Sequence, residues 1–353
     1  MIDIIIPAYN AHDTIEDTLH SIAMQVDKDK IHVIIVNDGG KDYNNIVQRF
    51  KQWIDIKEID CPNNCGPGYA RNYGIENSNS EYIIFMDADD AFTSSYSLSS
   101  LHTIAINSKA NIITSKILEI QKLPNNEYRA NEMEPNLMWL FGNVYKRSFL
   151  EKYNIHFFTT CYNEDVGFNS ACSILSYCDK DSVGIATLIN SPATYEWKWN
   201  GNSLSRKYNQ KQLQKAQLNV LGYIYTHLKA LYHVEQYMET PPQQYIHGVM
   251  IMLFTLYQYH DLMMVQEKDN LTNEFELAQL MELLSRYFCY KYYNFIGKTV
   301  PFETFQDELI KHISEDKDRM IVSFPDFIDW MFSQPPIEDY NILDIESKLF
   351  QSK

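Results

Sequence analysis

The sequence predicts an α/β protein with a mostly parallel β-sheet in its first part and an all-helical second domain. Short apolar runs alternate with amphipathic stretches up to about residue 120, which is typical of repeated βαβ units. After residue 208 the apolar positions recur near the 3.6-residue period of helices. With 353 residues, the chain exceeds the size at which one hydrophobic core usually stops growing, so we expect two domains, 1–208 and 209–353.

The individual elements follow from the spacing of the apolar residues. Short runs predict strands at 2–7, 32–36, 54–59, 82–86 and 111–120, and amphipathic stretches predict helices at 13–24, 44–53 and 164–177. Asp13 and Glu16 have the spacing of a capping box at the start of the first helix. The second domain is expected to contain helices at 213–237, 244–266, 274–295 and 302–313.

Charge and composition exclude several classes of protein. The net charge of −16 disfavours a nucleic-acid binder or a polybasic membrane anchor, because both need a cationic surface. Met1 leads directly into an apolar run without a secretory signal, and the longest apolar stretch, Val249 to Leu256, is far shorter than the ~20 residues of a transmembrane helix. Six cysteines at low density are typical of reduced thiols. We therefore expect a cytoplasmic protein without a transmembrane segment.

The apolar run at 81–86 ends in three carboxylates, Asp87, Asp89 and Asp90. Because strand side chains alternate between faces, we expect Asp87 and Asp89 to project the same way at the carboxyl end of a buried strand. Two adjacent carboxylates supply the hard oxygen ligands that Mg²⁺ and Mn²⁺ prefer. A plain solvated turn is the alternative, and this motif alone does not decide between the two.

The residues that follow the other strands belong to the same edge of the predicted sheet. Ligands of open α/β sheets bind beyond the carboxyl ends of the strands. Pro7-Ala8-Tyr9-Asn10 follows the first strand, Asn37-Asp38-Gly39-Gly40 follows the second, and Gly66 to Gly74 precedes the aspartate strand. A single ligand site built from these loops is therefore expected.

In this order, these motifs resemble the family 2 glycosyltransferases of GT-A fold, from Ile2 to about Arg206. Members of that family are inverting enzymes that move a sugar from a nucleotide diphosphate donor to a hydroxyl group. The resemblance implies a hexosyltransferase with Mn²⁺ or Mg²⁺ as cofactor. A carboxylate accepts the imide N–H of uracil, so Asp38 favours a UDP-sugar donor over a purine one.

The resemblance also implies roles for individual residues. Asp38 would read the uracil, Arg71 would help to hold it, Asp89 would ligate the metal, and Asp87 would contact the metal or the ribose. The expected nucleotide-sugar contacts are Pro7, Ala8, Tyr9, Asn10, Asp38, Gly68, Arg71, Asp87, Ala88 and Arg206. Lys198 is a further candidate for the diphosphate.

The general base of an inverting transfer is expected in Asn163-Glu164-Asp165, which is similar to the acidic pair of the family. Asp165 would take the acceptor proton, and the start of the following helix would keep it ionised. Without the upstream motifs, the two acids would be explained as a favourable helix N-terminus. Glu164, Trp139 and Asn143 are expected at the acceptor, and Phe141-Gly142-Asn143 replaces the Trp-Gly-Lys that relatives commonly have.

Other functions remain alternatives. A dehydrogenase is disfavoured because the glycine-rich turn for a dinucleotide is absent. A sugar nucleotidyltransferase and a non-catalytic glycosyltransferase-like binding or assembly subunit stay open. The expected partners are a UDP-sugar, a glycan, polymer or protein acceptor, and no nucleic acid. The helical domain would position the acceptor or mediate homo-oligomer formation.

Overall fold

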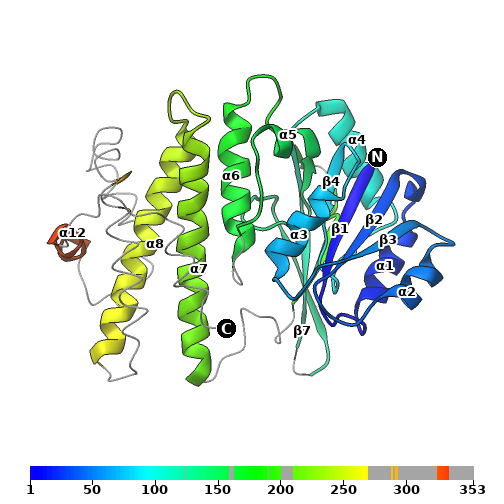
Figure 1. The fold of residues 1–353 in the computed structure, drawn as a ribbon, viewed down its shortest axis with the longest axis horizontal. Helices are drawn as coiled ribbons and strands as arrows, with labels where there is room; N and C mark the ends of the chain where they lie inside the picture. Colours follow the sequence, from blue (N-terminus) through cyan, green and yellow to red (C-terminus); the bar gives the residue numbers. More distant parts are fainter. Residues whose placement is uncertain are drawn as a thin grey trace. The chain divides into compact units, whose positions relative to one another are not determined.

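The computed structural model describes residues 1–123, 125–158, 163–189, 191–199, 210–268, 288, 291–292 and 324–333. The chain divides into two compact units, Met1–Lys207 and Tyr208–Lys353 (Figure 1). The second unit contains the helices α7 (Gln210–Glu235), α8 (Gln243–Lys268) and α12 (Phe324–Ser333). Among the described residues, no helix combines the length and the apolar character needed to cross a membrane.

The first unit alternates strands and helices in chain order. Its elements are β1 (Ile2–Ala8), α1 (Ile15–Ala23), η1 (Lys28–Lys30), β2 (Ile31–Asn37), α2 (Asn44–Phe50), β3 (Asp55–Asp60), α3 (Pro67–Glu76), β4 (Tyr82–Phe85), β5 (Ala91–Phe92), α4 (Ser97–Ser108), β6 (Ile112–Ser115), β7 (Ile117–Lys122), β8 (Tyr128–Met133), β9 (Val144–Lys146), α5 (Arg147–Lys152), α6 (Glu164–Cys178), β10 (Ile185–Leu188) and β11 (Tyr195–Trp199).

The strands of the first unit form two sheets. The larger has seven strands in the order β10-β6-β9-β4-β1-β2-β3, and the smaller has four in the order β5-β11-β7-β8. In the larger sheet only β9 runs antiparallel to its neighbours. The predicted α/β class with a mostly parallel sheet is therefore confirmed, and the described part of the second unit is helical.

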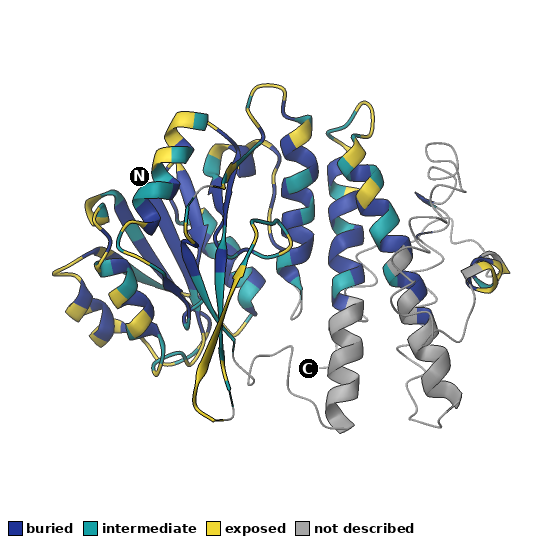
Figure 2. Ribbon diagram, turned by 180° about the vertical axis from the view of Figure 1, so that it is seen from behind, coloured by how far each residue is buried: buried dark blue, intermediate teal, exposed yellow. Residues whose placement is uncertain are grey.

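Strand β1 shows why the sheet needs helices on both faces. Ile4 and Ile6 pack in the core with Leu19 of α1 and Val47 of α2. Ile5 points to the opposite face, towards α3, as the alternation of strand side chains requires. In Figure 1, α3 lies on the opposite side of β1–β3 from α1 and α2. Figure 2 shows the resulting buried centre of the sheet and the largely exposed strand β8.

We expect Gly74→Ala to destabilise the first unit by about 1–3 kcal/mol, the usual effect of overpacking a core. An alanine β-carbon at this position of α3 would lie 2.4 Å from Ile5 Cγ2. The same change inside a helix is ordinarily stabilising, so the sign of the effect is informative. Urea unfolding measures it. Combining Gly74→Ala with Ile5→Ala makes room for the methyl group, and the double variant should lose less than the sum of the single variants; additive losses would contradict the close contact.

Two details of the sequence prediction are wrong. The expected strand at 111–120 is two strands, because the chain leaves the larger sheet after β6, passes Lys116 and enters the smaller sheet as β7. The expected capping box at Asp13 is absent: the first helix begins after Thr14 and has no side-chain cap. Glu16 instead pairs with Arg49 of α2, because a charged partner on a neighbouring helix competes with the local backbone.

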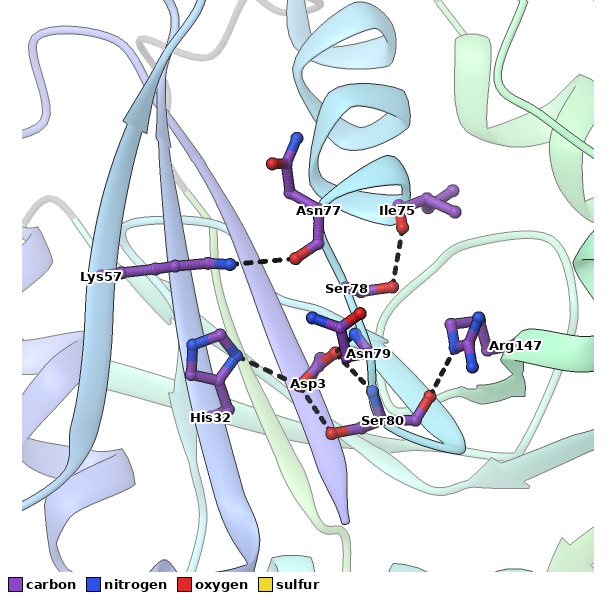
Figure 3. Close-up of polar contacts among 9 residues, drawn as sticks. All are labelled: Asp3, His32, Lys57, Ile75, Asn77, Ser78, Asn79, Ser80 and Arg147. Carbon is purple, nitrogen blue, oxygen red and sulfur yellow. Dashed lines mark hydrogen bonds and ion pairs between the residues drawn. The ribbon is translucent and has the colours of Figure 1, made fainter.

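A buried carboxylate stabilises the amino end of the larger sheet through hydrogen bonds. Asp3 of β1 accepts hydrogen bonds from the backbone N–H groups of Asn79 and Ser80, from the Ser80 hydroxyl and from the His32 ring (Figure 3). Burial opposes ionisation, but these hydrogen bonds outweigh it and lower the pKa of Asp3 to about 2. Arg147 Nε donates to the Ser80 carbonyl. The network joins β1 to the turn before β4, at the end of the strands opposite the predicted ligand site.

Candidate active site

The parallel strands of the larger sheet bring the predicted donor loops to one edge. Ala8 at the end of β1 is in register with Asn37 of β2, and Asn37 is in register with Asp60 of β3. Strand β4 is parallel to β1 and ends beside it. Because the carboxyl ends of these strands coincide, the segments that follow them share one rim. These segments begin at Tyr9, Asp38, Cys61 and Met86.

The segment after β1 combines buried backbone with exposed side chains. Pro7 and Ala8 are still part of the strand, and the Ala8 carbonyl accepts a hydrogen bond from the Asp38 N–H at 2.9 Å. Tyr9 is 53% exposed, and Asn10 adopts a left-handed backbone with φ 52°, a conformation that asparagine tolerates. Of the four predicted contacts in this segment, Tyr9 and Asn10 therefore expose their side chains at the rim.

Asp38 organises the loop in front of α3. It is buried, and its two carboxylate oxygens accept hydrogen bonds from the backbone N–H groups of Cys65 at 2.8 Å and Gly66 at 2.9 Å. The neighbouring Gly39 has φ 80°, and a β-carbon there would lie 2.6 Å from the Asn64 nitrogen. The loops after β2 and β3 are thus packed against each other. Reading of a uracil by Asp38 stays a prediction.

Asp87 and Asp89 lie in a turn beyond the strand. Strand β4 ends at Phe85, and the Asp90 N–H donates to the Asp87 carbonyl at 3.2 Å. The predicted strand alternation therefore does not govern these side chains, because a turn has its own backbone geometry. Asp87 and Asp89 are nevertheless both half-exposed, whereas Ala88 and Asp90 on either side of Asp89 are buried.

Asp90 holds this turn, a role that the sequence analysis missed. Its carboxylate accepts hydrogen bonds from the Tyr195 hydroxyl at 2.7 Å and the Lys198 N–H at 3.0 Å. The Tyr195 oxygen also accepts the Asp87 N–H at 3.3 Å. Burial and the nearby carboxylates of Asp87 and Asp89 raise the pKa of Asp90. Strand β11, far away in the sequence, thus fixes the aspartate turn, which no local sequence signal indicates.

Arg71 of α3 joins two carboxylates of the site. Its guanidinium Nη2 donates to Asp87 Oδ1 at 2.8 Å, and Nη1 donates to Glu164 Oε1 at 2.5 Å. The arginine side chain is 6% exposed and its charge lies 5.5 Å from the centre of the Phe157 ring. Burial acts against the charge, but the carboxylates around it hold the pKa of Arg71 above its ordinary value. The arginine is therefore a buried cation between the aspartate turn and α6.

Two further residues of α3 hold the segment that leads to α6, and neither role was foreseen. The Asn72 amide donates to the Phe157 carbonyl and accepts the Phe157 N–H, both at 2.8 Å. At Gly68, predicted as a donor contact, a β-carbon would lie 3.1 Å from Glu164 Cγ and 3.3 Å from the Phe158 carbonyl oxygen. The absence of a side chain at Gly68 thus lets α6 approach α3 closely.

Asp165 lies in the first turn of α6, beside Glu164. Glu164 is buried and bonded to Arg71, whereas Asp165 keeps partial exposure. Burial and the Glu164 carboxylate raise the pKa of Asp165 to about 7, with Arg71 acting in the opposite direction. This direction is opposite to the expectation that the helix start keeps Asp165 ionised, because burial and the Glu164 carboxylate disfavour the charged form. A carboxyl group that titrates near neutrality is suited to proton transfer.

The predicted acceptor residues lie in an aromatic cluster. Phe141 stacks on Tyr195 and Trp197 with ring centres 5.7 and 5.4 Å apart, and Trp139 lies 5.8 Å from Trp197. Asn143 is buried, and its amide donates to the Trp139 carbonyl at 2.7 Å. Asn143 thus supports the loop of Trp139, while the half-exposed Trp139 presents an aromatic surface. The cluster adjoins the aspartate turn through Tyr195.

Comparison with known proteins gives the family of this region. The model of the glycosyl transferase family 2 matches residues 3–163, which include the donor loops, the aspartate turn and the segment up to α6. Residues 3–163 belong to glycosyl transferase family 2. The resemblance seen in the sequence is therefore confirmed for this part of the chain.

Two glycosyltransferase relatives are similar to about a quarter of the chain. The poly-beta-1,6-N-acetyl-D-glucosamine synthase of Staphylococcus epidermidis is 35% identical over 89 residues, 25% of this chain and 21% of its own. The putative teichuronic acid biosynthesis glycosyltransferase TuaG of Bacillus subtilis is 37% identical over 95 residues, 26% of this chain and 36% of its own. The chain thus spans about a fifth to a third of these relatives. The crystal structure of S. aureus TarS 1–349 in complex with UDP-GlcNAc has a TM-score of 0.49 at 17% identity, covering 72% of this chain and 81% of that chain.

The carboxylates of the family 2 domain fit a divalent metal only as an open site. Within the described residues, no group of three or more His, Cys, Asp or Glu side chains is arranged to hold a metal ion. Asp87 and Asp89 are half-exposed and supply hard oxygen atoms, although Arg71 already occupies one oxygen of Asp87. Such a pair suits Mg²⁺ or Mn²⁺ whose remaining positions go to water and substrate oxygens. The predicted diphosphate contact at Arg206 lies outside the described residues.

Proposed function

We propose that this protein is an inverting glycosyltransferase that moves a sugar from a UDP-sugar to a hydroxyl group of a cell-envelope polymer. The observation that carries the proposal is the Arg71 contact to both Asp87 and Glu164. It brings the aspartate turn of the donor side next to the acid pair of α6. Membership of residues 3–163 in glycosyl transferase family 2 supports the same reaction type.

On the donor side, the UDP moiety would lie on the rim of the larger sheet. Tyr9 and Asn10 expose their side chains there, and the Asp38 carboxylate lies behind the loop that leads into α3. Asp87 and Asp89 would hold a divalent cation with the diphosphate. When bound, the cation would stabilise the negative charge that develops on the leaving diphosphate.

On the acceptor side, Asp165 would act as the general base. Inversion requires that the acceptor hydroxyl lose its proton while it attacks the anomeric carbon from the side opposite the diphosphate. Asp165 is partly exposed in the first turn of α6, and Trp139 of the same unit is a half-exposed aromatic side chain. Aromatic side chains pack well on the apolar face of a sugar ring.

The proposed acceptor class rests on the relatives. Two of them are named for poly-beta-1,6-N-acetyl-D-glucosamine and for teichuronic acid. Both are polymers that present many hydroxyl groups. A growing polymer or a finished chain of this kind is therefore the proposed acceptor, and the transferred sugar is proposed to be a hexose or N-acetylhexosamine.

A donor screen tests the proposal. The full chain is incubated with UDP-N-acetylglucosamine, UDP-glucose, UDP-galactose and GDP-mannose, and nucleotide diphosphate release is measured with Mn²⁺, with Mg²⁺ and with EDTA. We expect metal-dependent release of UDP. Release of GDP alone would contradict the assignment of Asp38, and no release with any donor would favour the non-catalytic binding subunit.

We expect the rate of sugar transfer to rise with pH through about 7 and to level off above it. The base must be deprotonated, and the pKa of Asp165 is raised to about 7, so protonation removes activity as the pH falls through that value. The measurement is kcat/KM between about pH 5 and pH 9 at constant ionic strength. A profile that is already flat above about pH 5 would show that the base has the ordinary pKa of an aspartate.

A further inference from the structure

Three residues on one face of α3 hold the chain segment that leads into α6. Gly68, Arg71 and Asn72 have the i, i+3, i+4 spacing of side chains that share a helix face. Gly68 leaves the space that the Glu164 side chain fills, and Arg71 bonds Glu164. Asn72 makes two hydrogen bonds to the Phe157 backbone. Helix α3 therefore fixes where the acid pair begins.

Arg71 links this face of α3 to the donor side. Its second terminal nitrogen bonds Asp87, whose backbone is part of the aspartate turn. Asp87 and Glu164 are 77 residues apart in sequence (164 − 87), and the arginine is the link between them that the structure describes. Its Nε is buried without a hydrogen-bond partner among the described residues, so both directed contacts are made by the two terminal nitrogens.

The negative charges around Arg71 explain why a cation is needed between the aspartate turn and α6. Asp87, Glu164 and Asp165 bring up to three negative charges around one guanidinium. Without the arginine, Asp87 and the acid pair would repel each other, and a buried Glu164 would lose its cation. Lysine cannot replace it fully, because a single ammonium is a point charge and lacks the planar fork that reaches two carboxylates in fixed directions.

We propose that Arg71 is a positioning residue that holds the acid pair of α6 in a fixed place relative to Asp87, and that Glu164 acts through Arg71 instead of touching the acceptor. This inference rests on the proposed function, because it assigns Asp165 to the acceptor proton and Asp87 to the donor. It departs from the uracil contact that the family resemblance implies for Arg71. Both contacts of the guanidinium described here are to carboxylates, and its side chain is 6% exposed.

Steady-state kinetics of Arg71→Lys separate the two roles. A positioning residue affects the chemical step, so turnover at saturating UDP-sugar should fall by about 10²-fold, the effect of a small misplacement of reacting groups. The dissociation constant of uridine, which has no phosphate, should stay within about threefold of the wild-type value. The matched control is Arg49→Lys. Both terminal nitrogens of Arg49 also donate to a glutamate, Glu16, but the Arg49 side chain is 56% exposed. Arg49→Lys should change neither quantity.

A second measurement tests the contact without any catalysis. Thermal unfolding is compared for Arg71→Met, Glu164→Gln and the double variant. If Arg71 neutralises a buried Glu164, Arg71→Met alone leaves an unpaired carboxylate, and adding Glu164→Gln should recover part of the lost melting temperature.

The outcomes distinguish the alternatives. Weaker uridine binding with normal turnover in Arg71→Lys would overturn the positioning role in favour of a uracil contact. Additive losses in the thermal cycle would overturn the proposed link by itself. A wild-type chain that releases no UDP in the donor screen would refute the proposed function, whereas the thermal cycle would still report on the Arg71–Glu164 contact.

Discussion

Asp165→Asn should lower turnover at saturating donor by about 10²- to 10⁴-fold, the contribution usual for a general base, while donor affinity persists. The amide has nearly the shape of the carboxylate but cannot accept the acceptor proton. Asp165 lies in the first turn of α6, next to a buried residue that is bonded to α3, so the substitution leaves the supporting contacts in place. Turnover and UDP affinity, measured on the same preparation, separate chemistry from binding.

Glu164→Gln is the control for this prediction. The glutamine keeps an oxygen that can accept the Arg71 hydrogen bond, so its loss of turnover should be smaller than that of Asp165→Asn. A near-normal rate for Asp165→Asn, or a Glu164→Gln enzyme that is the less active of the two, would assign the base to another residue. The first result would also remove the reason to connect the pH profile with Asp165.

Asp89→Ala should weaken metal-dependent binding of UDP by more than about 10²-fold, since even indirect partners of metal ligands contribute 10- to 100-fold. The half-exposed Asp89 is one of two carboxylates in the aspartate turn that fit a divalent cation. The fold should persist, because Asp90 stays in place and bonds Tyr195 and the backbone of β11. Calorimetric titration with UDP in Mn²⁺ and in EDTA measures the effect.

The matched control is Asp55→Ala. Asp55 is also an exposed aspartate of the first unit, but it begins β3 at the amino end of the sheet, away from the rim. Its removal should leave UDP affinity unchanged. Equal UDP–Mn²⁺ affinities for wild type and Asp89→Ala would show that the metal site is elsewhere in the chain.

Local patterns predicted four of the seven strands in the larger sheet and missed β9 and β10. The predicted strands at 2–7, 32–36, 54–59 and 82–86 correspond to β1, β2, β3 and β4 within one or two residues. In β1, β2 and β4 the reason is that a strand buried on both faces is apolar along its whole length. The prediction of a single strand at 111–120 was wrong, because it also relied on an apolar run. An apolar run shows burial but does not show that the chain changes from one sheet to another.

Composition and order of motifs also identified the candidate site, but only in part. Short motifs that follow strands or open helices predict Asp38, Arg71, Asp87 and Asp165 as site residues. Asp90 was treated as one more acid, whereas the structure buries it against Tyr195, which is 105 residues away. Such a partner has no counterpart in local sequence.

The sequence by itself determined the α/β class, the family resemblance and the residues that line the rim, because periodicity and short motifs are local properties of the chain. Only the tertiary structure decided what those residues contact. Arg71 bonds a carboxylate 93 positions away. Burial of Asp165 and the Glu164 carboxylate raise the pKa of Asp165 to about 7, while Arg71 acts in the opposite direction. Hydrogen bonds and desolvation depend on which distant segments meet, so the chemistry of a buried charge needs the fold as well as its neighbours in the sequence.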